Sequence, residues 1–178
     1  FQKRISDEFM NQLRGEKNQE TGQREHGYIQ AIGNRYNTLS NEMRSGNVEI
    51  KETPNLVKLA NDVKKQLPEL SDPVQQQITK KWAEELSTNK KVNGADFLES
   101  YRGFKQELRK MNDKYYEHGV SIKEQRALRP EINQLKDQLK TMKGVMDEQL
   151  GGQYLSKLKD IDKQYATYVA PLSKNPVY

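Results

Sequence analysis

The apolar residues of this chain recur every three or four positions, which is the spacing of one face of an α-helix. The positions between them are mostly charged or amide residues, so each stretch has one apolar stripe and a wide polar face. The pattern predicts about six helices, mostly amphipathic and joined by short loops. The first two apolar stripes, over residues 1–13 and 28–43, belong to one N-terminal segment with a glycine-interrupted link. The other stripes run over residues 56–67, 74–86, 97–115, 128–146 and 154–168.

Local signals mark where several of these helices begin. Thr53–Pro54 and Ser71–Asp72–Pro73 each place a capping residue before a proline in the first helical turn. Ser121, with Glu124 three positions later, forms a capping box at the start of another helix. Pro130 lies inside that helix, and we expect it to kink the helix or split it there.

The chain offers little material for β-structure. The one plausible extended piece is residues 48–50, which is too short to start a sheet on its own. Residues 87–94, with the sequence STNKKVNG, are interpreted as a loop between two helices.

Residues 97–115 and 128–146 carry apolar residues in alternating steps of four and three, which is typical of a coiled-coil seam. Consecutive helices joined by short loops pack antiparallel. The chain is therefore predicted to be all-α, an elongated antiparallel bundle of about six helices with coiled-coil-like seams. The predicted parts are an N-terminal helical segment with a glycine-interrupted link (1–45), a short helical hairpin (46–94) and a three-helix antiparallel bundle (95–178), with 46–178 as one domain.

Composition supports this picture and narrows the possible functions. Hydrophobic residues make up 33% of the chain and charged residues 31%, which suits narrow helical stripes better than the continuous apolar strands of a buried sheet. The absence of cysteine excludes disulfides, thiolate metal sites and cysteine nucleophiles. No stretch approaches the ~18 consecutive apolar residues of a transmembrane segment. The chain also begins at Phe1 rather than a methionine, so we expect it to be a fragment of a longer protein. Since no membrane span is predicted, we expect that fragment to be soluble.

No group of residues typical of an enzyme stands out. His26 and His118 lie in polar or glycine-flanked turns, without a second ligand at metal-binding spacing. The nearest approach to a catalytic acid is Glu84–Glu85 beside Trp82, but Trp82 lies on the apolar stripe and the glutamates on an ordinary polar face. We therefore predict that the protein is not an enzyme, and that it has no catalytic, metal-binding or cofactor-binding residues.

The net charge is +5, and the basic residues are spread along the chain. Two lysine pairs, Lys80–Lys81 and Lys90–Lys91, bracket the end of one predicted helix and its loop. They are candidates for contact with phosphate or with an acidic partner, and any DNA contact there would be non-specific and sensitive to salt. A solvated helix surface is the alternative interpretation, because no aromatic residues are interleaved with these lysines.

Four stretches in series carry a resemblance to a known family. They are TPNLVKLANDVKKQLP, VNGADFLESYRGFKQELRKM, LRPEINQLKDQLKTMKGVMDEQL and YLSKLKDIDKQYATYVAPLSKNPVY. Together they resemble a helical region of large internal virion proteins of tailed phages and prophages, which include DNA-ejection, DNA-transfer and transglycosylase-type proteins. The matching residues are Asn93–Gly94 and Asp96–Phe97 at one helix start, and Asp162, Tyr165, Tyr168 and Val169 in the final helix.

The resemblance implies a non-enzymatic structural or assembly module of a phage internal virion protein that is ejected with the DNA. It implies other virion proteins as partners, or self-association through helix faces. It also implies a location in the virion interior and delivery into the bacterial host envelope or cytoplasm. The transglycosylase domain is a separate unit in such proteins, and none of its catalytic residues can be carried over to this chain. A nucleic-acid-binding helical module, or a non-catalytic segment of a cell-wall-degrading virion protein, are the alternative hypotheses.

Overall fold

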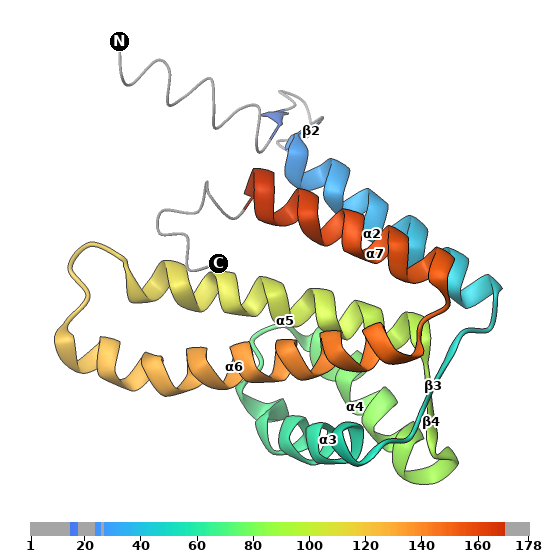
Figure 1. Ribbon diagram of the computed structural model, residues 1–178. Helices are drawn as coiled ribbons and strands as arrows, with labels where there is room; N and C mark the ends of the chain where they lie inside the picture. The colour runs from blue at the N-terminus through green and yellow to red at the C-terminus, as the bar shows by residue number, and fades with distance from the viewer. Residues whose placement is uncertain (1–14, 18–23, 26, 170–178) are drawn as a thin grey trace.

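Two long antiparallel helices, α5 (Gly94–Tyr115) and α6 (Ile122–Gln149), lie at the centre of the structure (Figure 1). The computed structural model describes residues 15–17, 24–25 and 27–169. Six α-helices make up most of this part of the chain, which confirms the predicted all-α helical bundle. The other four helices are α2 (Tyr28–Ser45), α3 (Pro54–Gln66), α4 (Pro73–Asn89) and α7 (Gly152–Gln164).

The α5–α6 hairpin buries the two seams that the sequence predicted. The buried seam residues are Phe97, Tyr101, Phe104 and Leu108 on α5, and Ile132, Leu135, Met142 and Met146 on α6. Pro130 lies inside α6 and the helix is continuous, so the proline does not split it, and the alternative of a kink stays a prediction. Pro130 and Arg126 are both exposed, so the Arg126 carbonyl that loses its helical hydrogen bond lies on the solvent side of α6.

The short helices α3 and α4 form a second hairpin against the first, joined by a 3₁₀ turn (Leu67–Glu69). In this arrangement α3 packs on α6, and α4 packs on α5. Trp82 on α4 is fully buried and meets the Phe97 ring edge-on, with 5.2 Å between ring centroids. Thr53 and Asp72 cap the two helices as predicted, since their side chains accept hydrogen bonds from the backbone N–H groups of Leu56 and Val74.

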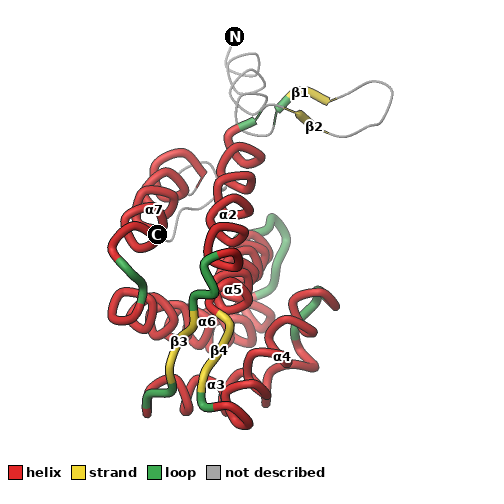
Figure 2. The backbone as a smooth tube through the Cα atoms, turned by 90° about the vertical axis from the view of Figure 1, so that its right-hand side faces the viewer, coloured by secondary structure: helices red, strands yellow, loops and turns green. Residues whose placement is uncertain are grey.

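A short two-stranded ribbon corrects the prediction of a loop at residues 87–94. α4 continues to Asn89, and β4 (Lys91–Asn93) pairs antiparallel with β3 (Glu49–Lys51), as Figure 2 shows. Ile50 and Val92 stand opposite each other in this ribbon and are at most 1% exposed. The ribbon depends on this contact between segments distant in sequence, which the pattern within 87–94 does not reveal.

The last helix, α7, has α2 as its main packing partner, and α2 packs in turn on α5 (Figure 1). Ile32, Tyr36, Leu39 and Met43 form the buried stripe of α2, as the sequence predicted. A π-helical turn (Tyr165–Val169) follows α7. The division of the chain at residues 45 and 94 stays a prediction.

The start of the chain is described only in part. β1 (Glu16–Lys17) pairs antiparallel with β2 (Arg24–Glu25) just before α2. The apolar stripe predicted over residues 1–13 lies outside the described residues.

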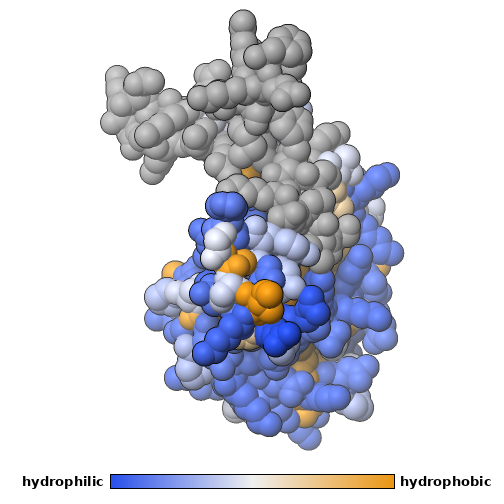
Figure 3. Space-filling view, turned by 90° about the vertical axis from the view of Figure 1, so that its left-hand side faces the viewer, coloured by the Kyte–Doolittle hydropathy of each residue, from blue (hydrophilic) through white to orange (hydrophobic). Residues whose placement is uncertain are grey.

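The face of the molecule that carries the α5–α6 connection is mainly hydrophilic, with a small hydrophobic spot (Figure 3). Tyr116 and Ile122 flank this connection and are 43% and 69% exposed. A spot of this size is ordinary for a folded protein surface and does not by itself mark an interface.

Candidate functional site

The four lysines predicted to contact phosphate or an acidic partner lie in the middle of α4 and just after its end. They are Lys80 and Lys81 on α4, Lys90 after its last residue, and Lys91 in β4. The Nζ atom of Lys81 lies 2.9 Å from Asp96 Oδ2, and that of Lys91 lies 3.2 Å from Glu49 Oε1. Two of the four charges therefore have acidic partners within the chain, and phosphate contact here stays a prediction.

Asp96 gives Lys81 a structural role. The Oδ1 atom of Asn93 accepts hydrogen bonds from the backbone N–H groups of Ala95 and Asp96, which caps the start of α5. The Asp96 side chain is only 6% exposed, and Arg44 Nη2 on α2 donates to its Oδ1 at 3.0 Å. The hydrogen bond and the charge of Asp96 raise the pKa of Lys81. Asp96 thus ties both α2 and α4 to the start of α5.

A second polar cluster joins α2, α5 and α7, and sequence reasoning missed it. Asp162 on α7 accepts hydrogen bonds from the hydroxyl groups of Tyr36 at 2.6 Å and Tyr101 at 2.9 Å. Lys105 Nζ lies 2.7 Å from Asp162 Oδ1, and the two side chains are 14% and 11% exposed. Burial lowers the pKa of Lys105, and the charge of Asp162 opposes this. Because these groups bind one another, the cluster serves to hold the three helices together.

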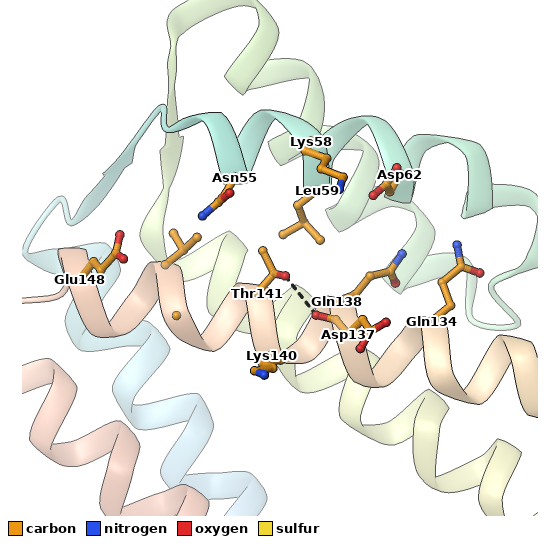
Figure 4. A pocket seen from close by; sticks show the side chains of 12 residues that line it. Asn55, Lys58, Leu59, Asp62, Gln134, Asp137, Gln138, Lys140, Thr141 and Glu148 are labelled. Atoms are coloured by element: carbon orange, nitrogen blue, oxygen red, sulfur yellow. Dashed lines mark hydrogen bonds between the residues drawn. The ribbon is translucent and has the colours of Figure 1, made fainter.

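A groove between α3 and α6, called the α3–α6 groove below, is the candidate binding site (Figure 4). Its volume is about 520 Å³. Leu59 and Val145, only 3% and 4% exposed, form its apolar floor. The remaining lining is polar apart from one glycine: Asn55, Lys58 and Asp62 on α3, and Gln134, Asp137, Gln138, Lys140, Thr141, Gly144 and Glu148 on α6.

Gln138 is the unusual residue of this groove. Its side chain projects from α6 toward α3 (Figure 4) and is 5% exposed. Neither its Nε2 nor its Oε1 atom has a hydrogen-bond partner in the described part of the chain. A buried amide without partners is destabilising, because its groups have lost their hydrogen bonds to water. A residue that costs stability in this way is a candidate for binding an external ligand.

Gly144 leaves space on the α6 side of the groove. A Cβ atom added at this position would meet no atom within 4 Å. A glycine inside a helix lowers helix stability relative to alanine by roughly 0.5–1 kcal/mol. It also allows another chain to approach the helix backbone closely. Gly144 therefore suits a groove that receives a ligand.

The charges of the groove are unevenly placed. Asp62 on α3 and Asp137 on α6 lie on opposite walls near Gln138, while Glu148 lies toward the other end (Figure 4). Neither Asp62 nor Asp137 makes an ion pair with another described residue. The end of the groove around Gln138 thus presents two carboxylates that can receive a cation.

Other candidate chemistry finds no support in the described part of the chain. His118 lies in the α5–α6 connection, and His26 lies outside the described residues. Among the residues described, no cluster of three or more histidine, aspartate or glutamate side chains is arranged to hold a metal ion. Over the same residues, the helices are either too short or too polar to cross a membrane. In the comparisons with known proteins, this chain matches no protein-family model, no curated protein and no solved structure.

Proposed function

We propose that this chain is a non-enzymatic helical assembly module that holds a partner protein in the α3–α6 groove. The observation that carries this proposal is the buried amide of Gln138, which has no hydrogen-bond partner among the described residues. A partner that pairs with this amide would restore the hydrogen bonds that the fold itself leaves unmade. Binding of the partner would thereby stabilise the folded chain against unfolding.

The wider setting of the proposal is a phage internal virion protein, and it rests on the resemblance of the four stretches quoted above. The structural roles of the matching residues support a structural segment. Asn93 caps α5, Asp96 ties α2 and α4 to it, and Asp162 ties α7 to α2 and α5. In this proposal the partners are other virion proteins or a second copy of the chain. The module would reside in the virion interior and be delivered with the DNA into the host.

A role in binding nucleic acid receives less support from the site. Three carboxylates line the α3–α6 groove, those of Asp62, Asp137 and Glu148, and they would repel phosphate groups. Retention of DNA that falls steeply between low and moderate salt would favour this alternative. A gel-shift series over that range of salt tests it directly.

Photo-crosslinking of the full chain tests the assembly role. The photoreactive residue benzoylphenylalanine would replace Lys140 on the groove wall, and Lys123 as a matched control. Both lysines are exposed residues of α6, but Lys123 lies outside the groove. We expect crosslinks to a virion protein or to a second copy from position 140 and none from position 123. No crosslinked polypeptide from position 140, or equal crosslinking from both, would contradict the proposal.

A further inference from the structure

We infer that the α3–α6 groove binds an extended polypeptide segment that carries a lysine or arginine side chain. In this inference a main-chain amide of the segment pairs with Gln138, and the basic side chain lies between Asp62 and Asp137. The inference rests on the proposed function and names the chemistry of the partner.

The Gln138 side chain selects a ligand that has a donor and an acceptor side by side. Its Nε2 atom donates and its Oε1 atom accepts, and neither has a partner among the described residues. The N–H and C=O groups of one residue in an extended chain supply the complementary pair. The Asn55 amide lines the same groove and can extend such main-chain pairing. The Thr141 hydroxyl donates to the Asp137 carbonyl at 3.0 Å and can still accept a hydrogen bond from the segment.

The lining of the groove favours a polypeptide over two other polymers. None of the twelve lining residues is aromatic, so the groove lacks the stacking surface that nucleobases use in single-strand binding sites. Its three carboxylates against two lysines disfavour a phosphate backbone. A saccharide would also lack an aromatic face to lie on. The peptide unit needs only the amide and hydroxyl groups that are present.

The groove is long enough for a short extended segment. Its lining on α6 runs from Gln134 to Glu148, and a helix rises about 1.5 Å per residue, so the groove is about 21 Å long. At about 3.3 Å per residue, an extended chain of about six residues spans this length. Gly144 lets the main chain of the segment lie close to α6.

Gln138 as a residue is 5% exposed, and both polar atoms of its amide are buried. A segment reaches it when side chains at the surface turn outward. Lys58, Gln134 and Lys140 are exposed side chains on the groove walls that can do so. Once the segment is seated, the low exposure of the amide strengthens the hydrogen bonds that it makes.

The negative charges beside Gln138 favour a basic side chain in the bound segment, next to the main-chain amide that pairs with Gln138. Asp62 and Asp137 flank Gln138 from the two helices and have no cationic partner among the described residues. A lysine or arginine of the segment placed between them would make charge-assisted hydrogen bonds. A glutamate at the same place would face two carboxylates and be rejected.

A library of random dodecapeptides, selected on the full chain and counter-selected on Gly144→Trp, tests this inference. We expect the enriched peptides to contain lysine or arginine, and synthetic copies to bind the unchanged chain in fluorescence polarisation. Methylation of the nitrogen of one central peptide bond should weaken binding about tenfold, because it removes one main-chain donor. The Asp62→Asn/Asp137→Asn double variant should weaken it by a similar factor and make it insensitive to salt.

Gly152→Trp is the control, because it adds the same side chain to an exposed glycine outside the groove. Peptides that bind Gly144→Trp and Gly152→Trp equally well, or a library that yields no binder, would overturn the inference. So would an oligonucleotide that competes for the groove. If selected peptides bind only through the groove but no polypeptide is crosslinked, the inference stands and the assembly role is rejected. If a polypeptide is crosslinked but no selected peptide depends on the groove, the assembly role stands and the inference is rejected.

Discussion

Lys105 on α5 and Asp162 on α7 form a buried ion pair, with 2.7 Å between Lys105 Nζ and Asp162 Oδ1. The same carboxylate accepts hydrogen bonds from Tyr36 on α2 and Tyr101 on α5. The Nζ atom also lies 4.8 Å from the centre of the Tyr165 ring, at a distance that permits a cation–π interaction. One carboxylate thus connects three helices that are distant in sequence.

Asp162→Asn should destabilise the fold strongly. The change leaves the Lys105 ammonium group buried without an opposite charge, and breaking a buried pair in this way costs about 3–5 kcal/mol. Urea denaturation followed by circular dichroism measures the free energy of unfolding. Asp160→Asn is the matched control, because its pair with Arg35 at 2.8 Å is exposed, with side chains 61% and 38% accessible. The control should cost less than about 1 kcal/mol. Equal losses for the two variants would show that the buried cluster has no special role.

The stability of the fold should fall as pH rises above about 10. Burial, with the charge of Asp162, raises the pKa of Tyr36 and Tyr101 above the ordinary tyrosine value. These two phenols keep their protons in the folded state, while in the unfolded chain they ionise near pH 10. Their contribution is therefore complete below pH 10 and declines above it, by about 1.4 kcal/mol per pH unit for each group.

Lys105 acts with the opposite sign in the same pH range. Its pKa is lowered by burial, so the unfolded chain binds its proton more tightly, and deprotonation favours the folded state as pH rises toward about 10.5. Because two tyrosines lower the free energy of unfolding above about pH 10 and one lysine raises it, the free energy of unfolding should fall overall. Urea denaturation at pH 9, 10 and 11 measures it, and phenolate absorbance shows whether Tyr36 and Tyr101 ionise only on unfolding. Stability that is constant or rises between pH 10 and pH 11 would refute the prediction.

The helices of this fold could be predicted from the sequence, but the polar contacts between them could not. Phe97, Tyr101 and Phe104 follow helical spacing, and burial of one face is a local property that spacing reveals. Lys105 and Asp162 are 57 positions apart, and each alone looks like an ordinary charged residue beside an apolar stripe. Their pairing depends on how α7 packs against α2 and α5, which periodicity does not specify.

The same limit applies to the groove and to the ribbon. Gln138 falls among charged residues on α6, and only the packing of α3 over it makes it buried. Ile50 and Val92 are isolated apolar residues in polar segments, and they form a ribbon because the fold brings them opposite each other. Lys81 was a candidate for contact with phosphate, but its partner Asp96 becomes visible only once α4 and α5 are placed together.

Alanine substitutions at two glycines should have opposite effects on stability. Gly144 and Gly119 both have open space for a Cβ atom, but Gly119 has a left-handed backbone with φ of +88°. Gly144→Ala should stabilise α6 by roughly 0.5–1 kcal/mol, because alanine is the better helix former. Gly119→Ala should destabilise the fold by about 1–2 kcal/mol, because a side chain disfavours that conformation. Thermal and urea denaturation of the two variants measure the difference, and a shared sign would contradict this assignment.

Measuring both stability and peptide binding for Gln138→Leu tests the role of the α3–α6 groove most directly. Leucine should raise the free energy of unfolding by about 1–3 kcal/mol, because it removes a buried amide that has no partner among the described residues. The affinity for peptides selected on the groove should at the same time fall at least about tenfold. A variant that loses stability and binds those peptides with unchanged affinity would show that Gln138 supports the fold and does not contact a partner.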